Sequence, residues 1–259
     1  MAQLMQFSAT LWLRGFILGC EIFIKNLCAG YGSVQVLHDV NLEVHQAETV
    51  VLLGTNGNGK STLMKTIMGL IPATSGEVLA RIDDQVYKLH ELRTEEIVNL
   101  GICLVPEGRH LFPRLSVRKN LLLGSYRAAA RSKLLETLEL VFEIFPILKE
   151  REHQLAGSMS GGEQQMVALG RVLMSQPRLL LIDEPSVGLA PIYVQKVVSQ
   201  IEELKERIGL TVLMAEQNFT QAIRVADRGY VIVHGQIAMQ ASASELSNSD
   251  LIRQHYMGT

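Results

Sequence analysis

Apolar and polar residues first alternate at every second position, in IFIKNL from Ile22 and VNLEV from Val40. Residues 49–53 (TVVLL) then form a continuous β-branched and apolar run, which is typical of a buried strand. Gly54–Lys60 contains three glycines that interrupt this strand, and helical spacing resumes over Ser61–Leu70. A strand, a glycine-rich loop and a helix thus follow one another in the order that a phosphate-binding site requires.

The rest of the chain alternates between short buried strands and helical segments. Strands are expected at 76–89 (a pair), 102–105, 179–182 and 211–214, a hairpin at 230–239 around His234-Gly235, and helices at 128–150 with a break near Pro146, after Gly161-Gly162 to about Gln176, at 194–207 and at 219–226. This alternation predicts an α/β fold with a parallel sheet. The mostly helical middle, about 107–176, is expected to be a subdomain inserted into one domain over 21–259, after an irregular extension over 1–20.

The composition is that of an ordinary folded protein. With 259 residues, of which 47% are hydrophobic and 19% charged, the chain can bury a core and falls outside the disordered class. Lys and Arg total 24 against 26 Asp and Glu, a net charge of -2, which argues against a protein that coats nucleic acid. Cys20, Cys28 and Cys103 have no paired spacing, so the sequence predicts neither a disulfide framework nor a zinc site and favours a reducing compartment.

No apolar run reaches the roughly 18 to 20 residues that span a bilayer. Leu11–Leu18 comes nearest, but it is short, Arg14 interrupts it, and no basic residue precedes it as a secretory signal requires. We therefore do not expect an integral membrane protein.

The glycine-rich interruption fits the phosphate-loop pattern G-x-x-x-x-G-K-[ST]. Its backbone N–H groups and the positive end of the following helix are expected to face phosphate oxygens, while Lys60 reaches the β- and γ-phosphates and Ser61 ligates Mg²⁺. A glycine-rich turn with a solvated lysine would not explain the position between a buried strand and a helix. The expected phosphate-binding residues here are Gly54, Thr55, Asn56, Gly57, Asn58, Gly59, Lys60, Ser61 and Thr62.

A second apolar run, Leu179–Ile182, ends in two acids, Asp183 and Glu184. Ligands of open α/β sheets bind at the carboxyl ends of strands, where these acids fall. Asp183 is expected to hold Mg²⁺, and Glu184 to orient or deprotonate the attacking water. Alone, the pair would be a solvated acidic turn; beside a phosphate loop it predicts a bound Mg²⁺ and a catalytic base for the attacking water.

A third feature is the helix start at Ser160, Gly161, Gly162 and Glu163. Taken alone, it is a capped helix N-terminus with flexible glycines. It is also an anion site, and one phosphate loop does not need a second such site in the same pocket. This second anion site suggests that another copy of the chain, or a similar one, presents the helix start to the γ-phosphate.

Together these motifs resemble the nucleotide-binding subunit of ABC transporters over about 21–259, with Walker A at Gly54–Ser61, the family signature at Ser160–Glu163 and Walker B at Leu179–Glu184. The resemblance implies the P-loop ABC ATPase fold: a core with a parallel sheet, an antiparallel β subdomain and an inserted helical subdomain. It also implies that Tyr31 stacks on adenine and that 186–190 (SVGLA) is the D-loop.

Two positions depart from the wider family. Glu107 stands where the Q-loop glutamine is usual, and Gln217 replaces the switch histidine. A carboxylate at 107 can still ligate Mg²⁺ or water, whereas Gln217 can donate to the γ-phosphate but cannot carry a proton. The resemblance therefore places catalysis on Glu184, Lys60 and Gln217, and Mg²⁺ on Ser61, Glu107 and Asp183.

Both departures, with PEGRHLFPRLSV (106–117) and the ending IRQHYMG, are similar to the ATPases of branched-chain amino acid importers, above all the smaller of the two. Importers of urea or short amides share these features and stay open as alternatives. The resemblance implies transmembrane permease partners, a second ATPase subunit (identical or similar), a periplasmic substrate-binding protein, no nucleic acid, and a peripheral place on the cytoplasmic face of the inner membrane.

Three other readings are weaker. Soluble ABC ATPases that act on DNA or ribosomes usually add a long coiled coil or a second cassette, for which 259 residues leave no room. ATPases of lipid or polysaccharide exporters usually have glutamine and histidine where this chain has Glu107 and Gln217. A metabolic kinase would leave the Ser160–Glu163 helix start unexplained.

Overall fold

The computed structural model describes residues 19–248. Most of the predicted N-terminal extension and the ending IRQHYMG lie outside these residues, and Cys20, which the prediction assigned to the extension, is the first residue of β1. Ten strands are described: β1 (Cys20–Tyr31), β2 (Val34–Val44), β3 (Thr49–Leu53), β4 (Ala73–Ile82), β5 (Gln85–Lys88), β6 (Ile102–Val105), β7 (Leu179–Asp183), β8 (Thr211–Glu216), β9 (Arg228–Val233) and β10 (Gln236–Ser242).

The described helices are mostly short, and α8 and α9 are the longest of them. Their bounds are α2 (Lys60–Ile67), α3 (Thr94–Asn99), α4 (Val117–Leu122), α5 (Ala128–Ser132), α6 (Leu134–Ile144), α7 (Pro146–Glu150), α8 (Gly161–Leu173), α9 (Pro191–Ile208), α10 (Phe219–Val225) and α11 (Ala243–Asn248), with 3-10 turns at Leu89–Glu91 and Ala156–Ser158. Within residues 19–248, no helix has both the length and the apolar character needed to cross a bilayer.

The predicted parallel sheet is present, with strand order β10-β9-β3-β8-β7-β6 and only β10 antiparallel to its neighbour. The strands β3, β7 and β8 are buried at every position because both faces of the sheet are covered. In β3, Val50 and Leu52 belong to one buried cluster and Val51 and Leu53 to the other. The unbroken apolar run that predicted a buried strand thus serves two cores.

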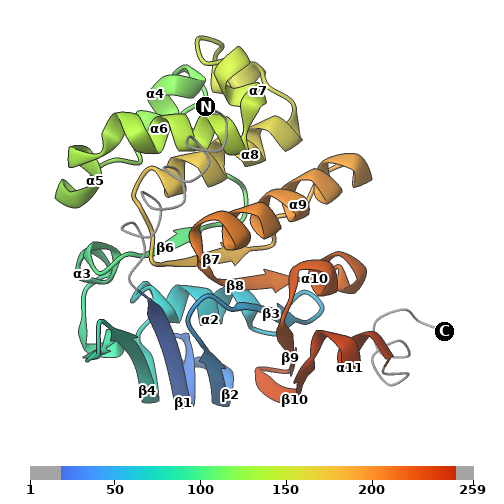
Figure 1. Cartoon of the computed structure of the whole chain (residues 1–259). Coiled ribbons are helices and arrows are strands. Elements are labelled where there is room, and N and C mark those ends of the chain that lie inside the picture. Colours follow the sequence, from blue (N-terminus) through green and yellow to red (C-terminus); the bar gives the residue numbers. More distant parts are fainter. Residues whose placement is uncertain (1–18, 249–259) are drawn as a thin grey trace.

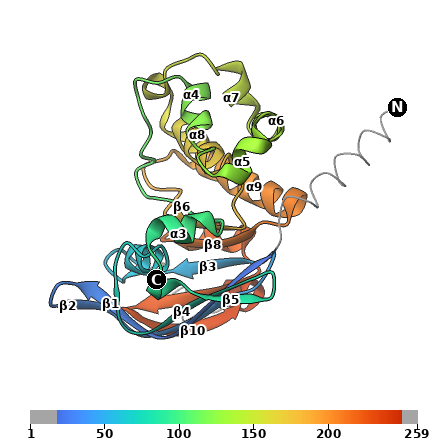
Figure 2. The same cartoon turned by 90° about the vertical axis from the view of Figure 1, so that its left-hand side faces the viewer.

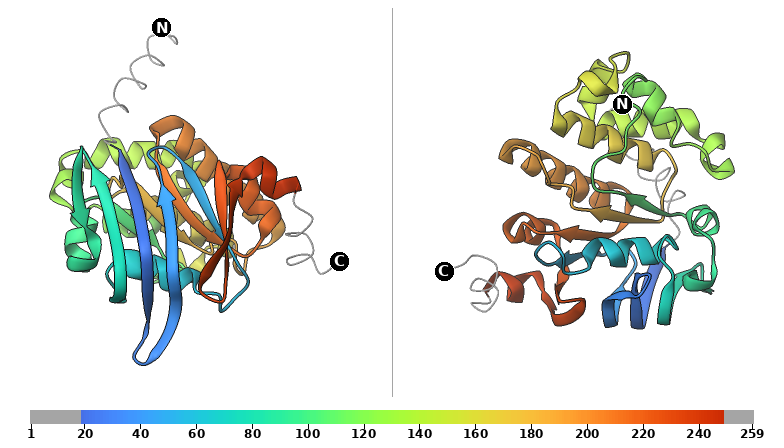
Figure 3. Two further views of the ribbon diagram at one scale, coloured as in Figure 1. Left: turned by 90° about the horizontal axis from the view of Figure 1, so that it is seen from below. Right: turned by 180° about the vertical axis from the view of Figure 1, so that it is seen from behind.

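The second sheet is antiparallel, with order β2-β1-β4-β5, and helix α2 lies between it and the parallel sheet. Leu63, Met64 and Ile67 of α2 are fully buried there among side chains of both sheets. Seen from below, the blue and cyan strands of this sheet lie side by side, next to the red β9–β10 hairpin (Figure 3). Helix α2 is therefore clamped from two sides, which fixes the loop that precedes it.

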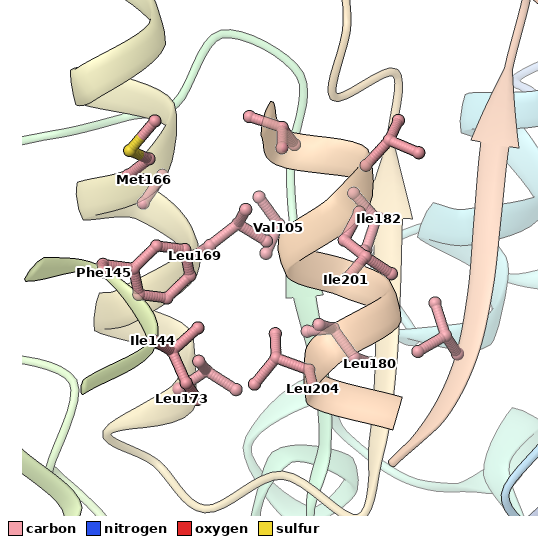
Figure 4. Packing of buried hydrophobic residues seen from close by; sticks show 14 of the residues in the cluster. Val105, Ile144, Phe145, Met166, Leu169, Leu173, Leu180, Ile182, Ile201 and Leu204 are labelled. Carbon is pink, nitrogen blue, oxygen red and sulfur yellow. The ribbon is translucent and has the colours of Figure 1, made fainter. Parts of the chain in front are cut away.

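Helices α4 to α8 form a separate layer beyond the opposite face of the parallel sheet (Figures 1 and 2). Leu169 and Leu173 of α8 meet Ile201 and Leu204 of α9 in the core below this layer (Figure 4). The segment 128–150 is divided into three helices, and the predicted break falls at Pro146, which opens α7 at a position where a missing N–H is harmless.

Three loops meet at one edge of the parallel sheet because β3, β8 and β7 are neighbours that run in the same direction. Leu53 is opposite Glu216, and Asp183 is opposite Ala215, so these strands end level with one another. The phosphate loop, the acids after β7 and the segment after β8 are therefore adjacent, although more than a hundred residues separate the first from the others.

Candidate functional site

The phosphate loop between β3 and α2 is shaped by two glycines and one asparagine. Gly57 and Gly59 have φ angles of 84° and 98°, in the left-handed region that side chains disfavour. Asn58 is held from two directions, because its Nδ2 donates to Thr55 Oγ1 at 2.7 Å and its Oδ1 accepts from the His234 N–H at 2.8 Å. The β9–β10 turn therefore supports the loop from outside.

Lys60 is the first residue of α2, and its side chain is only 3% exposed. Its ammonium donates to the carbonyl oxygens of Gly54 at 2.7 Å and Thr55 at 3.2 Å. It also pairs with Glu184 Oε1 at 2.9 Å, and the Glu184 side chain is 7% exposed. A buried ammonium held by one carboxylate and two carbonyls is positioned to exchange these partners for phosphate oxygens.

Ser61 and Asp183 meet at the same edge, where Ser61 Oγ donates to Asp183 Oδ1 at 3.0 Å. Burial raises the pKa of Asp183; the Ser61 hydrogen bond opposes this shift, and the negative charges of Glu184 and Glu107 add to it. A hydroxyl and a crowded carboxylate fit Mg²⁺, which prefers oxygen ligands. Residues 19–248 contain no group of three His, Cys, Asp or Glu side chains that could hold a metal, so phosphates and water would complete its coordination.

A cavity of about 380 Å³ lies at this edge. Its lining consists of Val36, Asn56, Gly57, Gly59, Lys60, Ser61, Thr62, Glu107 and Glu184. The cavity therefore joins the predicted phosphate loop to Glu107 and Glu184. Tyr31, half exposed at the end of β1, is not among its lining residues, nor are Asp183 and Gln217.

The turn after β7 holds Glu184 in an unusual conformation, with φ of 48°. Its backbone N–H donates to the Ala215 carbonyl of β8 at 3.0 Å, and its own carbonyl accepts from the Val187 N–H at 3.3 Å. On the neighbouring strand, Gln217 follows Glu216, and its side chain is exposed. Glu184 and Gln217, two of the three predicted catalytic residues, are thus attached to the end of β8.

The signature helix start lies outside this cavity, and Ser160 and Glu163 satisfy each other's hydrogen bonds there. Ser160 caps α8, its Oγ accepting from the Glu163 N–H at 3.4 Å, while Glu163 Oε2 accepts from the Ser160 N–H at 2.8 Å. Arg151 pairs with Glu163 Oε1 at 3.2 Å. A Cβ on Gly162 would stand 2.3 Å from the Tyr193 ring, so only glycine fits beneath α9. Within one chain, these residues contact no part of the phosphate loop's cavity.

Two further residues lie at this end of the sheet that the sequence motifs do not include. Val36, on β2, lines the cavity although it belongs to the antiparallel sheet. Glu216 is 2% exposed and accepts from three backbone N–H groups. The signal for Glu216 was present, since TVLMAE repeats the pattern of an apolar strand that ends in an acid, already used for Asp183 and Glu184.

The comparisons with known proteins agree with this geometry. The family model described as "ABC transporter" matches residues 37–187. The chain is 46% identical over 228 residues, 88% of its length and 95% of the relative's, to the high-affinity branched-chain amino acid transport ATP-binding protein BraG of Pseudomonas aeruginosa. It is 31% identical over 236 residues, 90% of its length and 95% of the relative's, to the lipopolysaccharide export system ATP-binding protein LptB of Escherichia coli.

Solved structures share the fold. An ATP-binding cassette of an ABC transporter in its ADP conformation has a TM-score of 0.77 and 25% identity, covering 93% of this chain and 99% of that one. The predicted P-loop ABC ATPase fold is confirmed by this likeness and by the two sheets described above.

Proposed function

This chain belongs to the ABC transporter family of ATP-hydrolysing proteins, and on that premise we propose that it is the ATPase subunit of an importer of branched-chain amino acids. The observation that carries the chemistry is the cavity in which Lys60 contacts Glu184 at 2.9 Å beside the phosphate loop. The observation that favours the cargo is the 46% identity to BraG, against 31% to an exporter's ATPase.

ATP binds with its phosphates along the loop 54–62, where free N–H groups of α2 face the cavity. Adenine stacks on Tyr31, which is exposed and available at the end of β1. Ser61, Asp183 and Glu107 hold Mg²⁺, either directly or through water, and the bound ion neutralises phosphate charge. The hydroxyl–carboxylate contact at 3.0 Å supports this assignment.

Hydrolysis depends on the release of Glu184 from Lys60. While the two are paired, the ammonium occupies a carboxylate oxygen that a base needs for water. Phosphate oxygens compete for the ammonium, so ATP itself frees Glu184 to accept a proton from the attacking water. Gln217 donates to the γ-phosphate and leaves the proton transfer to Glu184, because an amide side chain does not titrate.

A second ATPase subunit completes the site. The α8 start is a helix N-terminus with two glycines, and in this chain it lies outside the cavity that holds the phosphate loop. In a head-to-tail pair, Ser160 and Gly162 of each chain contact the γ-phosphate bound to the other. Either two copies or one copy with a similar ATPase would satisfy this arrangement.

A transmembrane permease binds at an apolar groove of about 330 Å³ between the sheet and the helical layer. Four of its lining side chains are about half exposed although they are large and apolar: Leu70, Phe112, Leu123 and Tyr126. Such a patch marks an interaction surface. Leu104 and Phe112 of the groove flank Glu107 in the chain, so movement of this loop on ATP binding would reach the permease.

We infer that the protein works at the cytoplasmic face of the inner membrane as a peripheral subunit, with a periplasmic substrate-binding protein in the same system and no role for nucleic acid. Urea or short amides remain the alternative cargo, because the ATPase does not contact the cargo. Glu107 and Gln217 count against lipid or polysaccharide export.

The test is Glu184→Gln, purified with its partners from detergent-solubilised native membranes and assayed with ATP and Mg²⁺. We expect ATP binding to persist, hydrolysis to fall by at least about 10³-fold, and a dimer to accumulate with bound permeases. Vesicles with the recovered permeases then distinguish leucine from urea uptake.

Glu136→Gln, on the exposed face of α6, is the matched control and should behave as wild type. Wild-type turnover in Glu184→Gln would contradict the assignment of the base. Recovery of ribosomal or DNA-bound proteins without a permease would contradict the transport function and leave the ATPase chemistry in place.

A further inference from the structure

Glu216 is a buried carboxylate to which neither the family motifs nor the proposed mechanism assigns a role. It ends β8 at the edge where the phosphate loop and the β7 turn meet, and it is 2% exposed. A buried carboxylate is unfavourable unless its oxygens are satisfied, so its partners indicate what it is retained for.

The two carboxylate oxygens serve two different segments. Oε1 accepts from the Ser186 N–H at 3.1 Å, in the turn that follows Glu184. Oε2 accepts from the N–H groups of Gln217 at 3.0 Å and Asn218 at 3.1 Å. One side chain therefore connects the segment that carries the proposed base to the segment that carries the proposed γ-phosphate donor.

A backbone hydrogen bond also connects the turn after β7 to β8. The Glu184 N–H donates to the Ala215 carbonyl at 3.0 Å, so the β7 turn is attached to β8 just before Glu184 by the backbone and just after it by Glu216. The φ of 48° at Glu184 is disfavoured for a non-glycine residue and persists only where the surroundings hold it.

We propose that Glu216 is a positioning residue that holds Glu184 and Gln217 in one fixed relation across the γ-phosphate position. The inference rests on the proposed ATPase site and deepens it: Glu216 contacts neither substrate nor the attacking water, and acts through the two loops that do. Loss of the connection should slow the chemical step and leave ATP binding unchanged, because the phosphate loop has its own supports.

Glu216→Gln tests this connection sharply because the shape is kept while one acceptor is lost. A glutamine has a single carbonyl oxygen, so it can serve Ser186 or the 217–218 pair, but not both. Burial raises the pKa of Glu216, and hydrogen bonds from Ser186, Asn218 and Gln217 oppose that shift, so the neutral side chain is tolerated. The thermal midpoint should stay within about 4 °C of wild type.

We expect kcat for ATP to fall about tenfold or more with KM within about twofold. In a Glu184→Gln background, measured by single-turnover hydrolysis, the added Glu216→Gln change should have less than a twofold effect, because its target is already disabled. Hydrogen exchange should become faster in peptides covering 184–188 and 216–219.

Glu48→Gln is the matched control: Glu48 is also a partly buried carboxylate, paired with Arg228 away from the cavity. It should lower the thermal midpoint without changing kcat. Wild-type kcat in Glu216→Gln, the same fold-loss in both backgrounds, or unchanged exchange at 184–188 and 216–219 would each overturn the inference. Absence of hydrolysis in the wild-type chain would instead contradict the proposed function, and the exchange data would still decide the connection.

Discussion

Two helix starts in this molecule carry glycines and face anions in the proposed mechanism, yet they are built in opposite ways. Helix α2 has Gly59 at its N-cap, no side-chain cap and no acid in its first turn. Helix α8 has Ser160 as a hydrogen-bonded cap and Glu163 in its first turn. The first start leaves its N–H groups unsatisfied by the chain, whereas the second satisfies its own.

The difference shows which start can bind phosphate alone. At α2, Lys60 and the N–H groups face a cavity, and the acids nearby are in excess of cations. At α8, Glu163 supplies the negative charge that the helix N-terminus attracts, and Arg151 balances it. The α2 start therefore leaves its N–H groups open to a phosphate, whereas a phosphate at the capped α8 start would be an additional partner, which the proposed mechanism assigns to a second subunit.

The largest expected effect is that of Lys60→Ala at the α2 start. Removal of the ammonium takes away its contact with the phosphates and leaves Glu184 without its cation, so hydrolysis should fall by at least about 10³-fold. Steady-state ATPase assays measure this, and circular dichroism confirms folding. Lys88→Ala, where an exposed ammonium pairs with Glu91 at 3.1 Å, is the control. Loss of less than tenfold would contradict the phosphate role of Lys60.

Ser160→Ala should have the next largest effect, and only when two subunits are present. Hydrolysis should fall about 10²-fold, while ATP binding to the single chain stays within about twofold. Ser116→Ala separates the two consequences of losing a cap, because Ser116 caps α4 through the Lys119 N–H at 3.3 Å. Both variants should lose about 1 kcal/mol of stability. Equal rates of hydrolysis in the two variants would show that Ser160 only caps α8 and does not contact the phosphate of a second subunit.

The sequence predicted the α2 side of this comparison better than the α8 side. The strand, loop and helix around Lys60 follow from local pattern, because apolar runs and glycines report directly on buried strands and tight turns. The predicted helix after Gly161-Gly162 begins at Gly161 itself, because Ser160 and Glu163 cap it there. The packing of Gly162 beneath Tyr193 could not be predicted, since α9 is about thirty residues away in sequence.

Long-range contacts account for the other omissions. Val36 reaches the cavity from the antiparallel sheet, and a pattern of alternating residues does not say which sheet a strand joins. Helix α3 (Thr94–Asn99) was not predicted, because six residues are too few to show a helical period. Glu216 was visible as an acid after an apolar strand, and two of its N–H partners are the next residues, but its contact with the Ser186 N–H depends on the order of β7 and β8 in the sheet.

The glycines of the two starts should respond differently to a methyl group. Gly162→Ala places a Cβ 2.3 Å from the Tyr193 ring and should lower the free energy of unfolding by about 1–3 kcal/mol. The Cβ of Gly57→Ala meets no atom within 4 Å, so the free energy of unfolding should fall only by the cost of a positive φ at alanine, about 1 kcal/mol. Gly32→Ala is the control for the cost of a positive φ, because Gly32 has a φ of 58° and equally open space around it. Denaturant unfolding of the single chain measures all three, and a larger loss at Gly57 than at Gly162 would reverse the comparison.

The smallest effect concerns the excess of acid at the α2 side. Burial raises the pKa of Asp183 above its ordinary value of 3.8, because the folded protein favours the neutral carboxyl. The neutral carboxyl therefore stabilises the folded state fully below pH 3.8, and this stabilisation is lost as the pH rises through the folded-state pKa. Asp183→Asn should therefore raise the thermal midpoint of the nucleotide-free protein in EDTA by about 2 °C at pH 8, and by less at pH 5. Glu163→Gln at α8 should do the opposite, because a glutamine still accepts from the Ser160 N–H but loses the negative charge and the pair with Arg151. A gain at α2 and a loss at α8 would show that one start is built to receive a charge and the other already holds it; losses of equal size at both would show that the two starts do not differ.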